Sequence, residues 1–208
     1  GKAIDTAKIT AYNIKSPSVI IPTIASTDAP CSANSVIYTK EGKFKRYFML
    51  PKNPDVVLID TKIIADAPVR FLVSGMGDAL STKFEAQSCR EKYANNLTGY
   101  KGSHTAYELA DLCYNMLMSF GFLAKQACDK CVVTQALEHI VEANTLLSGL
   151  GFESGGLAAA HAIHNGLTVI EQTHRYYHGE KVAFGTLTSL FLTDSDSYTI
   201  DEVYRFCS

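Results

Sequence analysis

The sequence predicts an α+β protein with two parts: residues 1–66 mix helix and strand, and residues 67–208 are all helical. Short runs of β-branched and aromatic residues, each bounded by turn residues, are confined to the first part. In the second part apolar residues recur at three- and four-residue intervals, which is the spacing of a helix. The pattern changes between Ile64 and Pro68, so the boundary is placed there.

The first part opens with a helical pattern and continues with four short strands. Apolar residues from Ala3 to Ala11 follow helical spacing. The segment Lys40–Lys43 is typical of a tight turn and joins the second and third strands as a hairpin. The predicted strands cover residues 18–22, 34–39, 45–50 and 56–60.

The second part begins with a long helix from Pro68 to Cys89, in which the proline suits the first turn. A helical rhythm also continues through Val203 and Phe206, close to the last residue. Because no strand precedes Gly1 and no capping glycine follows this rhythm, we expect a segment of a longer protein. Further helices are predicted over residues 104–126, 130–149, 154–165 and 180–192.

The composition argues against a nucleic-acid-binding protein and against a membrane-spanning protein. The formal net charge of −2 provides no basic footprint for a nucleic acid. No apolar run approaches the roughly 20 residues that a membrane span requires. Six scattered cysteines without a signal-peptide pattern indicate reduced thiols in the cytoplasm. The charged fraction of 19% leaves room for buried contacts between subunits, so we expect a homo-oligomer.

The most informative segment places His161 after a run of glycine and alanine, and His178 at a turn before the next helix. Neutral imidazole is a common ligand of divalent transition metals. Small residues let two backbones and a ligand come close together. The segment therefore indicates a metal ion held between two helices. The alternative is that each histidine is simply packed in the core or at the surface.

One acidic residue provides a third ligand for such a site. Asp78 lies between small residues on an otherwise apolar helix, and an unpaired buried charge is costly. Sharing a cation with His161 and His178 would compensate that charge and leave a coordination position open for a substrate. His164 follows His161 by three residues, so it is a further ligand, a proton relay or a packed side chain.

Two other segments have the character of binding loops. Thr23–Ser32 is rich in hydroxyl groups, contains Asp28, and directly follows the first strand. Ligands of α/β sheets bind outside the carboxyl ends of the strands, so this loop suits a nucleotide and a polyol. The alternative is a loop whose hydroxyl groups only cap the next element. Gly1 and Lys2 start a helix whose free N–H groups suit a phosphate.

Four motifs together resemble one family over essentially the whole chain. They are Thr23–Ser32, Gly75–Leu80, Gly151–His161 and His178–Leu187. The family contains iron-containing alcohol dehydrogenases, dehydroquinate synthase and glycerol-oxidising dehydrogenases, and the likeness is greatest to the last group. The resemblance implies a dehydroquinate synthase-like fold. Residues 1–66 would be the C-terminal portion of an NAD-binding α/β domain, and residues 67–208 a helical, metal-binding catalytic domain.

The resemblance also implies a reaction, the NAD-dependent oxidation of glycerol to dihydroxyacetone. A divalent metal, usually zinc and otherwise Fe²⁺ or another ion, would be bound by Asp78, His161 and His178 next to the substrate. Asp28 would bind the polyol and take part in catalysis, as would His164. The NAD site would be lined by Gly1, Lys2, Thr23, Ser26, Ser32, Asn34 and Tyr38, with a backbone contact at Asn34.

Two alternatives remain open at this point. A sibling alcohol or glycerol-1-phosphate dehydrogenase would share the motifs, although the phosphate of the second substrate needs basic residues that are not clustered near Asp28. A truncated, non-catalytic metal-binding remnant would keep the metal ligands alone. Since relatives in the family begin with strands that would precede Gly1, we expect these residues alone to bind metal but to bind NAD weakly.

Overall fold

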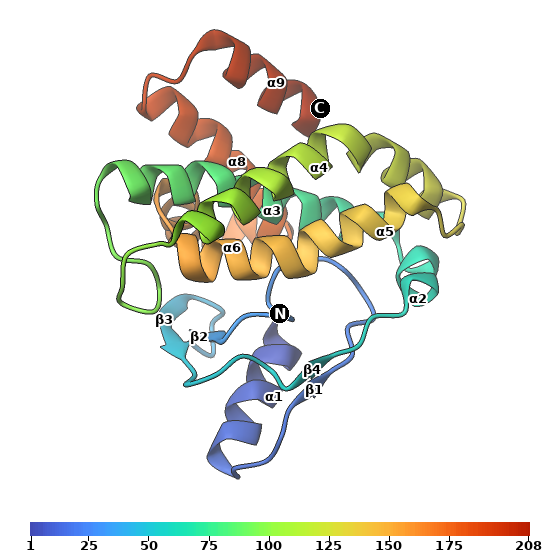
Figure 1. Ribbon diagram of the computed structural model, residues 1–208, viewed down its shortest axis with the longest axis vertical. Helices are drawn as coiled ribbons and strands as arrows, with labels where there is room; N and C mark the ends of the chain where they lie inside the picture. The colour runs from blue at the N-terminus through green and yellow to red at the C-terminus, as the bar shows by residue number, and fades with distance from the viewer.

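The computed structural model describes residues 1–208 as a mostly helical molecule with little sheet (Figure 1). Helix α1 and the strands gather at one end, and the longer helices form the other, larger part. The first elements along the chain are α1 (Lys2–Asn13), β1 (Val19–Ile20), β2 (Asn34–Tyr38), β3 (Phe44–Met49), β4 (Val56–Val57) and α2 (Thr61–Asp66).

The four strands form two separate pairs. Strands β1 and β4 are parallel, with Val19 opposite Val56, and β2 and β3 form an antiparallel hairpin. The hairpin turns at Gly42, whose φ of +81° favours glycine. The predicted strands 18–22 and 56–60 are each reduced to two residues. Pro22 has no N–H to donate to a ladder, which limits the length of β1.

The helical part contains every helix predicted there, with two corrections to the bounds. None of its helices combines the length and the apolar character needed to cross a membrane. The elements are α3 (Val69–Glu91), α4 (His104–Asp129), α5 (Gln135–Glu142), a π-helical turn (Ala143–Leu147), α6 (Ser148–Gly155), α7 (Ala159–Leu167), a 3₁₀ turn (Glu171–Thr173), α8 (His178–Leu192) and α9 (Ser197–Cys207).

The predicted helices 130–149 and 154–165 have the wrong bounds. The first helix begins only after Thr134, whose hydroxyl accepts a hydrogen bond from the Leu137 N–H and so caps the first turn. It then continues through the π turn to Gly155. Gly156 has a φ of +110°, which ends this helix and separates it from the next one, α7.

Helix α3 is the central element of the fold. It packs against α4, α6, α7 and α8, and all of its residues from Ser74 to Thr82 are buried. Leu72, Leu80 and Leu117 belong to the hydrophobic core formed around it. A helix that is covered on every side must be apolar or small throughout, so a charged residue in this stretch has to find its partners inside the protein.

Candidate metal centre

The three predicted metal ligands lie together although they come from three different helices. Asp78 is in the middle of α3, His161 is near the start of α7, and His178 is the first residue of α8. One candidate ligand atom from each lies within 4.8 Å of the other two. The Asp78 Oδ1 atom is 3.0 Å from His178 Nε2 and 3.5 Å from His161 Nε2. The structure therefore brings this set together as the sequence predicts.

Glycines allow the three helices to approach so closely. A Cβ atom on Gly179 would lie 1.7 Å from the carbonyl oxygen of Ser74, which brings the start of α8 onto the backbone of α3. A Cβ atom on Gly185 would lie 2.5 Å from the carbonyl oxygen of Ala160, so α7 and α8 also approach each other closely. His178 reaches Asp78 only because no side chain separates these backbones.

The environment of Asp78 fits a bound cation. Its side chain is 0% exposed, and its Oδ1 atom has no hydrogen-bond partner. An unpaired carboxylate oxygen in the interior is costly unless a positive charge compensates it. Both histidines turn Nε2 toward this oxygen, and one carboxylate with two imidazoles is a donor set that suits zinc and other divalent transition metals.

Glu85 orients one of these histidines and was not predicted from the sequence. Its Oε2 atom is 2.6 Å from Nδ1 of His161, and its Oε1 atom accepts hydrogen bonds from the backbone N–H groups of Ala158 and His161, at 2.8 and 3.0 Å. With Nδ1 protonated toward Glu85, the lone pair of Nε2 faces the cluster. The available signal was spacing, because Glu85 lies two helical turns after Asp78 on α3.

His164 lies beside the cluster and contacts one of its members. Its Nε2 atom is 3.0 Å from His178 Nδ1, and its own Nδ1 is 3.2 Å from the side-chain oxygen of Asn165. The amide of Asn165 donates to the Tyr47 hydroxyl at 3.1 Å. Burial, together with positive charge on His178 and His161, lowers the pKa of His164 to about 3, so this imidazole is neutral. A neutral ring can accept the His178 Nδ1–H, so that Nε2 of His178 would offer its lone pair to a bound metal ion.

The charges of the cluster stabilise one another. Burial opposes the ionisation of Asp78, but positive charge on the nearby His178 and His161 holds its pKa well below the usual value. Burial likewise opposes a charge on His161, yet Glu85 and Asp78 raise its pKa well above the usual value. The carboxylates thus attract positive charge to this point, which a proton supplies in the absence of a metal ion.

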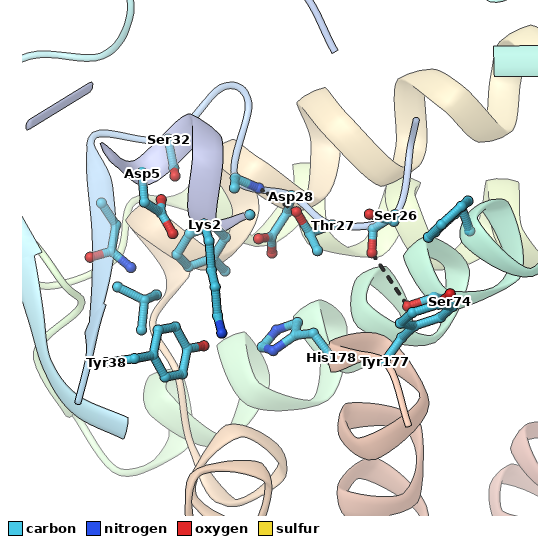
Figure 2. A pocket seen from close by; sticks show the side chains of 16 residues that line it. Lys2, Asp5, Ser26, Thr27, Asp28, Ser32, Tyr38, Ser74, Tyr177 and His178 are labelled. Carbon is cyan, nitrogen blue, oxygen red and sulfur yellow. Dashed lines mark hydrogen bonds between the residues drawn. The ribbon is translucent and has the colours of Figure 1, made fainter. Parts of the chain in front are cut away.

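A cavity of about 230 Å³ opens beside the cluster, and Figure 2 shows Asp28, Lys2, Tyr38 and His178 around it. This volume is below the roughly 300–1,000 Å³ of pockets for drug-sized ligands, so it suits a small polyol better than a whole dinucleotide. The lining includes six of the seven residues predicted for the cofactor: Gly1, Lys2, Ser26, Ser32, Asn34 and Tyr38.

The seventh of these residues, Thr23, is exposed and lies outside the cavity lining. Several lining residues were not predicted, among them Asp5 and Tyr177. Both lie within a helical turn of a predicted residue, Gly1 and His178 respectively, and that proximity was the signal available. Two buried polar atoms at the cavity, Ser32 Oγ and Asn34 Oδ1, have no hydrogen-bond partner within the protein. A ligand can therefore satisfy them.

Asp28 connects the cavity to the cluster formed by Asp78, His161 and His178. Its backbone N–H donates to Asp78 Oδ2 at 3.3 Å, and its Oδ2 atom accepts a hydrogen bond from the Ser148 hydroxyl at 3.0 Å. Burial raises the pKa of Asp28 well above its usual value, and the nearby charge of Asp78 raises it further. A carboxyl group held this way lies at the cavity and forms no hydrogen bond or ion pair with the histidines.

Comparison with known proteins identifies close relatives of the chain. The family model for iron-containing alcohol dehydrogenases matches residues 1–61. Glycerol dehydrogenases from Thermotoga maritima and Citrobacter freundii are 70% and 58% identical over 207 residues, which is 100% of this chain and 57% of each relative. The crystal structure of a probable glycerol dehydrogenase from Sinorhizobium meliloti matches with a TM-score of 0.97 at 51% identity, covering 100% of this chain and 58% of that one. The chain thus spans somewhat more than half the length of these relatives.

Proposed function

We propose that this chain, which is homologous with glycerol dehydrogenases over its whole length, holds the metal and the polyol in the NAD-dependent oxidation of glycerol to dihydroxyacetone. One observation carries the proposal. The unpartnered Oδ1 atom of the buried Asp78 faces Nε2 of two histidines, at the edge of a small cavity that also contains Asp28.

In this proposal Asp78, His161 and His178 hold a divalent ion, which we expect to be zinc, with Fe²⁺ as the alternative. A divalent ion bound there would supply Lewis-acid chemistry that lowers the pKa of a substrate hydroxyl, and NAD would be the hydride acceptor. The donor set suits both metals, so its geometry supports a divalent ion without choosing between them.

Other residues around the cavity are proposed to bind the polyol, to act on His178 and to bind a phosphate of NAD. Asp28 accepts hydrogen bonds from adjacent hydroxyl groups of the polyol and so orients the C–H bond that breaks. His164 is proposed to act through His178, because it contacts that ligand at 3.0 Å. Helix α1 has no side-chain cap at its start, so its first N–H groups near Lys2 are available to a phosphate of NAD.

The alternative substrate glycerol 1-phosphate receives less support. Apart from His178, Lys2 is the only basic residue among those that line the cavity, and in this proposal it faces the dinucleotide. A second phosphate close to Asp28 would meet a carboxyl group, which offers no positive charge. The homo-oligomer and the division into two domains at residues 66 and 67 stay predictions.

The test is an assay of NAD reduction with the full-length natural protein, first freed of metal and then reloaded with zinc. Glycerol, glycerol 1-phosphate and 1-propanol are compared as substrates. We expect activity with glycerol that disappears with the metal and returns with zinc. Undiminished turnover after complete metal removal, or a preference for glycerol 1-phosphate, would contradict the proposal.

A further inference from the structure

The segment 28–34, which joins the loop after β1 to strand β2, is held between two buried charges of opposite sign. Lys8 on α1 is 2% exposed and Glu153 on α6 is 7% exposed. Both side chains bind main-chain groups of this segment instead of each other. Lysine and glutamate side chains are almost never buried to this extent unless they are paired. The free-energy cost of burying these two charges therefore needs an explanation.

Lys8 binds the carbonyl side of the segment. Its ammonium group donates to the carbonyl oxygens of Ala29 at 2.9 Å, Ser32 at 3.1 Å, and Asn34. The carboxylate of Asp5 lies 3.6 Å away. All three N–H donors of the lysine are therefore used, and the surrounding oxygens resemble the ligands of a monovalent cation.

Glu153, in contrast, accepts hydrogen bonds from N–H donors in and beside the same segment. Its carboxylate accepts the backbone N–H of Ala33 and the side-chain amide of Asn53, the latter at 3.1 Å. That amide also donates to the carbonyl oxygen of Cys31 at 3.0 Å. The two charged side chains thus satisfy four backbone groups of the segment, three carbonyl oxygens and one N–H.

We propose that Lys8 and Glu153 are positioning residues that fix segment 28–34 relative to the cluster of Asp78, His161 and His178. In this role the Lys8 ammonium group is bound by carbonyl oxygens of the segment as a monovalent cation would be. The first residue of the segment, Asp28, donates its N–H to Asp78, and Ser32 and Asn34 face the cavity with unpartnered atoms. A shift of the segment moves all three. The inference rests on the proposed function only in that Asp28 binds the polyol.

The test uses the full-length protein with Lys8→Ala, Lys8→Met and, as the control, Lys62→Ala. Lys62 is exposed and pairs with Asp66 on the surface of α2. In Lys8→Ala the missing atoms have the size of propylammonium, whereas the methionine side chain fills that space. We expect both Lys8 variants to raise KM for glycerol at least about tenfold, from the loss of hydrogen bonds to a charged group, with metal content unchanged. Propylammonium should restore only Lys8→Ala.

A second measurement needs no turnover. Amide hydrogen exchange followed by mass spectrometry should become about tenfold faster in segment 28–34 of both Lys8 variants, and propylammonium should slow it again in Lys8→Ala. The unchanged protein in the same salt corrects for any general effect of the amine. Glu153→Gln, which keeps the volume of the side chain, should accelerate exchange in the same segment and covers the case in which Lys8→Ala fails to fold.

The outcomes separate the two proposals. Exchange in segment 28–34 that stays unchanged in Lys8→Met and Glu153→Gln would overturn the positioning role, as would accelerated exchange over the whole chain. If propylammonium changes neither the KM for glycerol nor the exchange rate of segment 28–34 in Lys8→Ala, the cation-like site is refuted. Local acceleration with rescue in a protein that never oxidises glycerol would retain the positioning role and reject the proposed function.

Discussion

Replacing Glu85 with glutamine should weaken metal binding without altering any proposed ligand. The carboxylate of Glu85 accepts two backbone N–H groups and lies 2.6 Å from His161 Nδ1. The amide of glutamine keeps one acceptor oxygen but turns an NH₂ group toward either the backbone donors or the imidazole. If it faces the imidazole, Nδ1 becomes the acceptor and the proton moves to Nε2, which then no longer offers a lone pair.

The expected loss of zinc affinity can be estimated from the loss of the hydrogen bond between Glu85 and His161. One hydrogen bond to a charged group contributes about 1.5–3 kcal/mol, and removal of a partner that orients a metal ligand costs about 10–100-fold in metal affinity. A loss of 10–100-fold corresponds to about 1.4–2.8 kcal/mol of binding free energy. The two ranges agree, so we expect Glu85→Gln to bind zinc about 10–100-fold more weakly.

The assay is a competition titration of zinc against a chelator at fixed pH, with Glu91→Gln as the matched control. Glu91 lies on the same helix, is exposed, and pairs only with Gln87. The control should bind zinc as the unchanged protein does. A zinc affinity of Glu85→Gln within twofold of the control would refute the reasoning, because His161 would then keep its tautomer without the carboxylate.

Three further predictions concern packing, substrate and protonation. Gly179→Ala should lower the free energy of unfolding by about 1–3 kcal/mol and reduce bound metal, because its Cβ would lie 1.7 Å from the Ser74 carbonyl oxygen. Gly166→Ala, with no atom within 4 Å of its Cβ, should instead stabilise by about 0.4–1 kcal/mol; equal effects in thermal denaturation would contradict this account. Asp28→Asn should raise KM for glycerol about tenfold more than KM for 1-propanol at unchanged metal content, and an equal loss on both substrates would assign the residue to loop structure alone. Burial, assisted by Asp28, raises the pKa of Cys31 from 9.0 to about 11. Its contribution to stability is therefore complete below pH 9.0 and is lost as the pH rises toward 11. Iodoacetamide labelling, followed by peptide mapping, should modify the exposed Cys131 at pH 8 and Cys31 only near pH 11. Equal labelling rates of Cys31 and Cys131 at pH 8 would contradict the raised pKa of Cys31.

Much of the helical architecture, and the residues that we propose as metal ligands, were predictable because they depend largely on local patterns. The apolar spacing from Val69 onward located α3, and an acid inside that pattern marked Asp78 as a residue in need of a positive partner. Glycine and alanine around His161 and His178 indicated close helix packing, which the structure confirms at Gly179 and Gly185. The resemblance to a family then selected these histidines from the others.

The remaining features depend on contacts between distant parts of the chain. Glu85 and Glu153 look like ordinary helix-surface acids in the sequence, and only the packing of α3 and α6 buries them. Lys8 likewise follows Asp5 by one turn, which predicts a surface ion pair instead of a cage of carbonyl oxygens. The helix end at Gly156 was missed because the alanines after it continue the helical pattern.

The measurement that tests the central claim most directly is the anomalous scattering of crystals of the zinc-loaded protein, recorded on both sides of the zinc edge. We expect one strong peak about 2.0–2.2 Å from a carboxylate oxygen of Asp78 and from Nε2 of His161 and His178. Helices α3, α7 and α8 should stay where the structure has them. A peak at any other residues, or its absence from zinc-saturated crystals, would contradict the assignment of the metal centre.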